Sequence, residues 1–302
     1  NSSFEENIAR TSGGVIASSG NVVIQNSNFT ANSITGSQNG GGANSNSGNF
    51  TIYDSNFTAN NAVNGGANYN LNGNMNIYNS NFTNNSATQG GANTNRNGTI
   101  EIKDSIFKQN SAVNGGANSN CNGTFYISNS TFIANTATQN GAIIYNDDKL
   151  DIAKLTLNDN YDVNGASIYT TQNISMTNTV VNNTFETYVY DNTDFISPLI
   201  ATNLPADEDV IFTVDGKSIV VNKNTTNSII KVIYNFTSSG IKRVNVVYPT
   251  SSNNAVIIFD VKRRDINITL NPVDDIKTLE NVNIIGTIKT STGEDVHGVI
   301  PI

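Results

Sequence analysis

Five aspartates near the middle of the chain have the residue type and the spacing that best fit a chemical role. Asp147, Asp148 and Asp151 lie close together, and Asp159 and Asp162 follow shortly after them. Clustered carboxylates serve acid–base catalysis on sugars, and they also bind Ca²⁺. The spacing allows a weak cation site, but solvent-exposed acids near the end of a repeat region are the favoured interpretation.

The sequence before these aspartates offers little catalytic chemistry. Through residue 146 its charged side chains are few and dispersed: Glu5, Glu6, Arg10, Asp54, Arg96, Glu101, Lys103, Asp104 and Lys108. The single histidine, His297, lies near the end of the chain in an expected loop, and we find no phosphate loop, nucleophile elbow or zinc-ligand spacing. We therefore expect a non-enzymatic protein without catalytic residues, a metal site or a cofactor.

The single cysteine, Cys121, cannot form a disulfide within the chain. It occupies a variable position of the repeat, which the sequence alignment of the repeats also assigns to Leu71, Arg96 and Asn146. We interpret it as a small packing residue rather than as a reactive thiol.

The overall composition excludes several classes of partner. The formal net charge is −8, and only 13% of the residues are charged, against about 25% in typical domains. Nucleic-acid binders normally carry a basic stripe, which this amide-rich sequence lacks. No apolar run approaches the ~18 residues of a membrane-spanning helix, so we expect neither nucleic acid nor a membrane as a direct partner of this segment.

Three side chains are candidates for ligand binding because they recur at the same position of the repeat. Tyr53, Tyr78 and Lys103 stand 25 residues apart, four residues before a repeated phenylalanine. Aromatic rings that stack on an outer face can hold sugar rings or a protein partner. Packing between neighbouring strands is the simpler role for the same side chains.

A phenylalanine recurs with a nearly fixed period through the first 180 residues. Successive members are 25, 28, 25, 25 and 25 residues apart, and Leu157 and Val181 continue the series: Phe4, Phe29, Phe57, Phe82, Phe107 and Phe132. A period of this length indicates an array of stacked coils. The three additional residues within 33–40 predict an outward excursion of the second coil.

Each coil shows the same short strand and the same corner. Apolar residues alternate seven and five residues before the phenylalanine, as in Phe50 and Ile52, which predicts a half-buried strand. Three residues before it stands Asn or Asp, which tolerates the left-handed backbone of a tight corner. These corner residues are Asn26, Asp54, Asn79, Asp104 and Asn129.

Three residues after each phenylalanine stands an asparagine without exception. We interpret this series as a structural ladder, in which stacked amides replace apolar bulk. Its members are Asn7, Asn32, Asn60, Asn85, Asn110, Asn135 and Asn160. A Gly-Gly-Ala follows, as at residues 65–67, and predicts a bend with close backbone contact. Short strands without a helical period predict an all-β fold, a right-handed parallel β-helix of about 25 residues per coil.

The pairing of Phe-x-x-Asn with Gly-Gly-Ala resembles the repeats of the chlamydial polymorphic membrane proteins and of adhesin-like surface proteins of methanogenic archaea. It reads Phe57-Thr58-Ala59-Asn60 with Gly65-Gly66-Ala67-Asn68, and it recurs through about residue 182. The resemblance implies an extracellular, cell-surface β-helix with a role in adhesion. Here Asn commonly follows Gly-Gly-Ala, where that family more often has an aliphatic residue.

Beyond the repeats the sequence changes to longer β-rich runs. We expect the β-helix with its C-terminal cap over residues 1–190, and an Ig-like β-sandwich over 196–263 that resembles the modules appended to bacterial adhesins. Asp215-Gly216 predicts a two-residue hairpin. Residues 264–302 are expected to be a linker and the opening strands of a further Ig-like module, with a turn at 290–295. We expect the chain to be part of a longer protein.

The leading functional hypothesis is a non-enzymatic, cell-surface adhesin-like protein, whose β-helix is presented on Ig-like spacers and binds a protein or glycan on a host or neighbouring cell. The alternative is a β-helix that binds or cleaves polysaccharide, of the lyase, hydrolase or phage-tailspike type. Sequons for N-glycosylation are frequent in this Asn-rich chain and are usable if the protein is secreted. They include Asn28, Asn49, Asn56, Asn81, Asn97, Asn122, Asn173, Asn224, Asn235 and Asn267.

Overall fold

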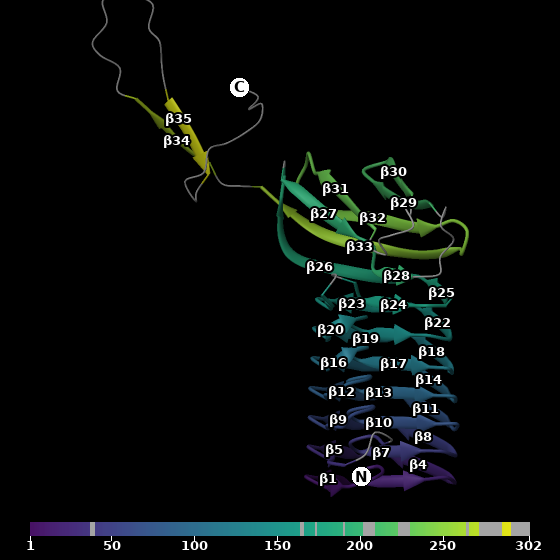
Figure 1. Ribbon diagram of the computed structural model, residues 1–302. Helices are drawn as coiled ribbons and strands as arrows, with labels where there is room; N and C mark the ends of the chain where they lie inside the picture. Colours follow the sequence, from purple (N-terminus) through teal and green to yellow (C-terminus); the bar gives the residue numbers. More distant parts are fainter. Residues whose placement is uncertain are drawn as a thin grey trace, which may run out of the picture.

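The computed structural model describes residues 1–36, 40–163, 166–172, 174–189, 191–201, 209–222, 230–263, 266–271 and 286–290. Over these ranges the chain forms strands and turns without a helix. It is a stack of parallel β-coils that is closed at one end by antiparallel strands (Figure 1). The expected all-β fold, a parallel β-helix followed by an antiparallel region, is confirmed.

Several sequence expectations lie outside the described residues. They are the tip of the excursion at 37–39, the turn at 291–295, His297, and the sequons at Asn173 and Asn224. Within 264–302 the described part is a hairpin of β34 (Ile266–Leu270) and β35 (Gly286–Thr290).

Three parallel sheets form the sides of the solenoid, and each coil contributes one strand to each sheet. The first sheet contains the strand that precedes each phenylalanine: β4 (Asn21–Gln25), β8 (Asn49–Tyr53), β11 (Asn74–Tyr78), β14 (Thr99–Lys103), β18 (Thr124–Ser128), β22 (Lys149–Ala153) and β25 (Ile174–Thr177).

The second sheet carries the phenylalanines. Its solenoid strands are β1 (Ser3–Glu5), β5 (Asn28–Thr30), β9 (Asn56–Thr58), β12 (Asn81–Thr83), β15 (Ile106–Lys108), β19 (Thr131–Ile133), β23 (Thr156–Asn158) and β26 (Thr179–Tyr188).

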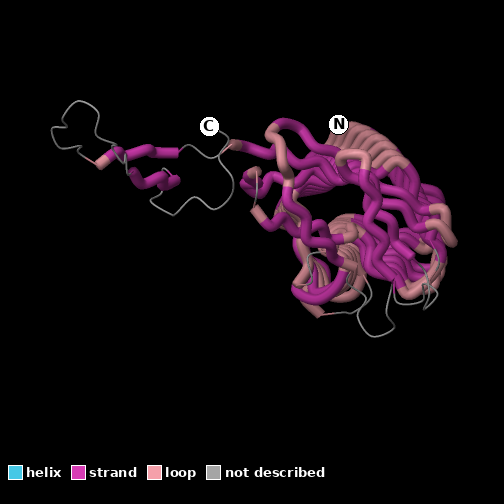
Figure 2. Tube along the Cα trace, turned by 90° about the horizontal axis from the view of Figure 1, so that it is seen from above, coloured by secondary structure: helices cyan, strands magenta, loops and turns pink. Residues whose placement is uncertain are grey.

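The third sheet follows the Gly-Gly-Ala segment. It contains β3 (Ile16–Ser18), β7 (Asn44–Asn46), β10 (Asn68–Leu71), β13 (Asn93–Arg96), β17 (Asn118–Cys121), β21 (Ile144–Asn146), β24 (Ile168–Thr170) and β28 (Leu199–Ala201). Two short pairs lie between the second and third sheets: β2 (Ile8–Ala9) with β6 (Ser33–Ile34), and β16 (Ser111–Asn114) with β20 (Thr136–Asn140). Viewed along the axis, the turns of successive coils overlie one another (Figure 2).

The predicted left-handed corner before each phenylalanine is present. All five Asn and Asp residues named for it have φ between 47° and 54°, and Lys154 and Asn178 continue the series in the last two coils. A second left-handed corner, two residues after the phenylalanine, was not predicted. Its residues vary in type, and they are Glu6, Ala31, Ala59, Asn84, Gln109, Ala134 and Asp159.

Ala59 shows that this second corner is locally strained. Its φ is 56°, a region that costs an L-residue with a Cβ roughly 1–2 kcal/mol, and its side chain is exposed. We expect Ala59→Asn to raise the unfolding free energy by about 0.5–1 kcal/mol, because Asn tolerates this conformation and Asn84 already adopts it in the next coil. Urea denaturation measures the change. The matched control is Ala17→Asn on an exposed strand position, where no gain is expected; an equal gain there would contradict the argument.

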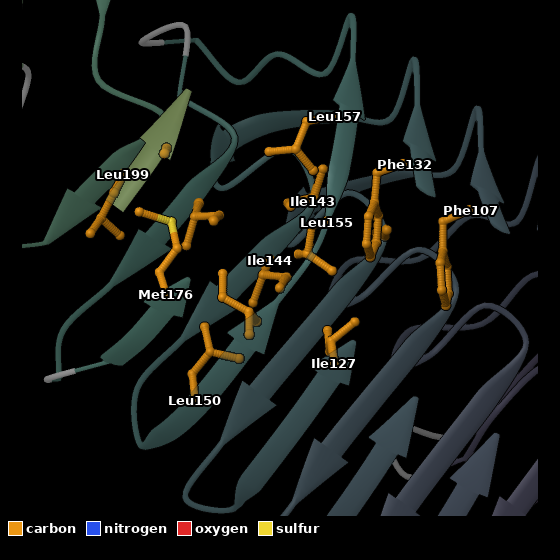
Figure 3. Packing of buried hydrophobic residues seen from close by; sticks show 14 of the residues in the cluster. Phe107, Ile127, Phe132, Ile143, Ile144, Leu150, Leu155, Leu157, Met176 and Leu199 are labelled. Atoms are coloured by element: carbon orange, nitrogen blue, oxygen red, sulfur yellow. The ribbon is translucent and has the colours of Figure 1, made fainter. Parts of the chain in front are cut away.

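The phenylalanines form a continuous column, which is fully buried from Phe29 onward and partly buried at Phe4. Neighbouring rings are stacked with centroids 4.7 to 4.9 Å apart, from Phe4 through Phe132. Figure 3 shows the end of this column, where Phe107 and Phe132 are followed by Leu157. The column lies in the core with the inward Ile, Phe, Met and Leu residues of the first sheet.

The predicted asparagine ladder runs beside this column. Asn85 accepts two hydrogen bonds at Oδ1, from the backbone N (2.9 Å) and from Nδ2 (3.0 Å) of Asn60. Its own Nδ2 donates to the carbonyl of Phe57 (2.9 Å) and to Oδ1 of Asn110 (3.0 Å). The five members from Asn32 to Asn135 are fully buried. Each internal rung therefore connects three coils with its side chain alone.

The asparagine that follows Gly-Gly-Ala forms a second buried ladder, which explains this departure from an aliphatic residue. Asn44, Asn68, Asn93 and Asn118 are linked by Nδ2–Oδ1 hydrogen bonds of 2.9 Å, and the row ends where Ile144 takes the next position. A third ladder lies two residues further on, through Asn46, Asn70, Asn95, Asn120 and Asn146.

The antiparallel strands close the solenoid by continuing its second sheet. β26 pairs with β23 and also, in parallel, with β33 (Asn253–Lys262). The order then runs through β32 (Gly240–Tyr248) and β29 (Asp209–Val214) to β30 (Lys217–Asn222). The predicted hairpin at Asp215-Gly216 joins β29 to β30, with φ of 47° and 76° at these two residues.

A second layer packs against this extension. β27 (Asn192–Ile196) pairs with β31 (Lys231–Asn235), and its Phe195 ring lies 5.0 Å from Phe259 and 5.7 Å from Phe236. The first sheet is closed by side chains of the β33 segment, since Oδ1 of Asn253 accepts from the backbone N of Met176 at 2.6 Å. The antiparallel region is thus bonded to the end of the solenoid.

Candidate functional site

The outer face of the first sheet brings together the three side chains that the repeat singled out. Tyr53, Tyr78 and Lys103 occupy one register position on β8, β11 and β14. The two tyrosine rings stack with centroids 5.3 Å apart at an angle of 21°, and Tyr53 is 39% exposed. The alternation of β8 sets this orientation, because Phe50 and Ile52 point inward between the outward residues.

The environment of Tyr78 is acidic as well as aromatic. Its pKa lies above the ordinary value, first because the phenol is partly buried and then because the Glu101 carboxylate and Tyr53 lie nearby. A side-chain hydrogen bond with Glu101 also contributes to the raised pKa, so the Tyr78 hydroxyl already has a partner on this face. A ligand would therefore contact the ring of Tyr78 rather than its hydroxyl.

The same face carries a second aromatic group that sequence reasoning missed. Tyr126 is 37% exposed, and Nζ of Lys149 lies 5.2 Å from its ring centroid and 3.1 Å from its hydroxyl. Lys149 also approaches Asp151 at 3.8 Å. The alternation of β18 in the sequence already places Tyr126 on the outer face. It was missed because the residues one repeat away, Glu101 and Asp151, are not aromatic, so no repeated aromatic position marked it.

Exposed asparagines add rows of amides beside these side chains. On the first sheet Asn49 donates from Nδ2 to Asn21 at 2.9 Å, and Asn74 donates to Asn49 at 3.2 Å. On the second sheet the equivalent row is Asn28, Asn56 and Asn81, with contacts of 2.9 Å. These rows give the outer surface a neutral, hydrogen-bonding character.

The aspartates of the sequence cluster have separate partners. Asp147 accepts from the backbone N of Asn122 at 2.7 Å, and Asp151 faces Lys149. Asp162 accepts from the backbone N of Gly141 and of Ala166, both at 2.9 Å. Among the described residues, no group of three or more His, Cys, Asp or Glu is arranged to hold a metal ion.

Cys121 lies half-buried on the third sheet, with Sγ 3.6 Å from Oγ of Ser119. Burial raises the pKa of its thiol, which disfavours the reactive thiolate. The sequence alignment placed Asn146 at the same position as Cys121, which is wrong: Asn146 pairs with Asn120, because the intervening segment is one residue longer. Leu71 and Arg96 do share the position.

Comparison of this chain with protein-family models, curated proteins and solved structures gives no match. Within the described part of the chain no helix is long and apolar enough to cross a membrane.

Proposed function

We propose that the chain is a non-enzymatic, adhesin-like protein of the cell surface, and that the outer face of the first sheet attaches it to a glycan or protein on a host or neighbouring cell. The observation that supports this proposal most directly is the stacked, outward-facing pair of Tyr53 and Tyr78 beside Lys103. The antiparallel region closes the solenoid, and extracellular display agrees with the many sequons of the sequence.

Physical chemistry favours this face as a binding surface. Tyrosine offers a large apolar ring with a polar end, and it loses little side-chain entropy on binding. Parallel strands hold the two rings in a fixed register, so little reorganisation is required when a ligand binds. The surrounding amides and the few charges suit an uncharged ligand such as a neutral glycan.

The test is a glycan array combined with whole-cell binding, using the complete chain and a Tyr53→Ala/Tyr78→Ala variant. We expect the variant to lose at least about tenfold in affinity, because two adjacent aromatic contacts are removed. Tyr145→Ala/Tyr169→Ala is the matched control, since it removes a stacked tyrosine pair from the third sheet. Equal binding by the double variant and the parent would show that this face is not the attachment site.

A polysaccharide-binding or polysaccharide-cleaving β-helix is the alternative. One observation favours it: the carboxylates of Asp159, Asp162 and Asp194 line a single cavity at the closed end of the solenoid. Incubating the protein with polysaccharides that bind it, and assaying new reducing ends, distinguishes cleavage from attachment. If the number of reducing ends increases with the parent protein and does not increase with Asp159→Asn, polysaccharide cleavage replaces the adhesin proposal.

A further inference from the structure

A cavity of about 450 Å³ lies where the last regular coil meets the antiparallel strands. Its apolar wall comes from different elements, with Leu157 on β23, Val181 on β26, and Ile257 and Phe259 on β33. Its polar wall is mainly the segment 159–162 of the last coil. Cavities of this size with a mostly apolar lining and a few polar groups are typical of small-molecule sites.

The cavity lies where β26 leaves the path that the chain follows in the lower coils. In those coils the chain turns through a left-handed residue two positions after the phenylalanine, and the next asparagine rung follows. β26 instead runs on as a strand from Thr179 to Tyr188. The main ladder therefore ends at Asn160, whose Nδ2 donates to the carbonyl of Asn158 in its own coil (3.0 Å). Among the described residues, no further coil follows the segment 159–162, and the cavity is lined there by residues of β26 and β33.

Two residues that line the cavity, Tyr161 and Asp162, differ from the residues at the same positions of the lower coils. The position of Tyr161 is occupied by Ser, Asn or Thr in the five coils below it, at Ser33, Asn61, Ser86, Ser111 and Thr136. The position of Asp162 is alanine in the four preceding coils, at Ala62, Ala87, Ala112 and Ala137. In the coil that faces the cavity, Tyr161 thus replaces Ser, Asn or Thr, and Asp162 replaces the alanine of the four preceding coils.

The carboxylates around the cavity have distinct roles. Asp162 is buried and accepts from two backbone N–H groups, so it completes the hydrogen bonding of the last coil. Asp159 accepts from the hydroxyl of Tyr161 at 3.1 Å. Burial and the Asp159 carboxylate raise the pKa of Tyr161 to about 12, so this hydroxyl remains a donor at neutral pH. Asp194 on β27 also lines the cavity; its side chain is 48% exposed and pairs with Lys231 at 2.6 Å.

We propose that this cavity binds a small organic cation, an ammonium group on an apolar body, as a site separate from the outer face of the first sheet. The apolar body packs against Leu157 and Phe259, and the ammonium group lies near Asp159 and the ring of Tyr161. Asp159, Asp162 and Asp194 line the cavity, and Lys231 offsets the charge of Asp194. The remaining negative charge repels an anionic ligand. The tyrosine face adds attraction for a cation.

The probe is 2-phenylethylammonium, measured by titration calorimetry with the complete chain. Its neutral and anionic counterparts, 2-phenylethanol and 3-phenylpropanoate, are titrated in parallel. We expect saturable binding of the cation, at least about tenfold weaker binding of the alcohol, and no binding of the carboxylate. If the cation shows no saturable binding up to about 10 mM, the proposal is overturned. It is equally overturned if the alcohol binds with the same affinity as the cation.

Three variants locate the site. Asp159→Asn removes the charge and retains a side chain that tolerates the φ of 53°, so binding should weaken at least about tenfold without unfolding. Leu157→Phe restores the residue of the lower coils and fills the cavity, so it should abolish binding while the stack of rings gains one member. Asp151→Asn, on the outer face of the first sheet, is the control. Unchanged affinity in both cavity variants contradicts this assignment.

Discussion

Gly91→Ala is expected to lower the unfolding free energy by more than about 4 kcal/mol, a large part of the roughly 5–15 kcal/mol that stabilises a typical domain. A Cβ at this position would lie 2.1 Å from the carbonyl O of Gly116, and 2.7 and 2.8 Å from the backbone O and N of Ser111. These contacts are with backbone atoms of the next coil, which cannot rotate away as a side chain would.

Relief of this overlap requires the two coils to separate. The backbone N of Gly91 donates to the carbonyl of Gly115 at 3.1 Å, and the ladder at Asn93 and Asn118 lies just beyond it. Separation of the coils would break this backbone hydrogen bond and the Asn93–Asn118 hydrogen bond. It would also open a gap in the stacked phenylalanine column. The repeat places a glycine at this position in four successive coils, at Gly42, Gly66, Gly91 and Gly116. The next coil, where the intervening segment is one residue longer, has Ala142 there.

Urea denaturation followed by circular dichroism measures the effect, with soluble expression as a first readout if the variant does not fold. Gly20→Ala is the matched control, because the nearest atom to its added Cβ is Oγ of Ser18 at 4.0 Å. That substitution should leave stability unchanged or slightly higher. A Gly91→Ala protein within about 1 kcal/mol of the parent would mean that the coils are not packed as closely as described.

Asn85→Ala is the second large effect, with an expected loss of about 3–5 kcal/mol. The substitution removes the acceptor of two donors on Asn60, and it removes the donor to the carbonyl of Phe57. These groups are buried, so water cannot replace the lost partners without entering the core. An unsatisfied buried polar group costs about 1–3 kcal/mol, and several are created at once.

The control for Asn85→Ala is Asn81→Ala in the same coil. Asn81 also belongs to a row of stacked amides, at 2.9 Å from Asn56, but it is exposed, so water can take the place of the lost hydrogen bond. We expect it to lose less than about 0.5 kcal/mol. Ligand binding by folded Asn85→Ala should equal that of the parent. If its stability is unchanged, the ladder does not stabilise the fold.

The solenoid could be predicted because a repeat brings identical positions into contact. Once Phe57 and Phe82 are known to occupy successive coils, their stacking follows, and so does the pairing of Asn60 with Asn85. The left-handed corner at Asp54 was found because only Asn and Asp occupy it in the regular coils. The corner at Ala59 has the same φ but varied residues, so no pattern of residue types marked it.

The candidate binding face was predictable for the same reason, and the cavity was not. Tyr53 and Tyr78 share a repeat position, so their stacking follows from the period. The cavity joins Leu157 to Phe259, which are about one hundred residues apart and outside any common repeat. Likewise, the backbone N of Met176 donates to Oδ1 of Asn253, a residue 77 positions later.

The sequence by itself therefore determined the stacked coils, their inward phenylalanine column, their asparagine ladder and one outward aromatic pair. Only the tertiary structure decided how the stack ends: which strand continues the second sheet, where the ladder stops at Asn160, and that a cavity remains above it. The physical reason is that a contact between equivalent positions of successive coils recurs, so the same residue types recur in the sequence and reveal it. A contact at the end of the stack is made once, between segments that are not related by the repeat period.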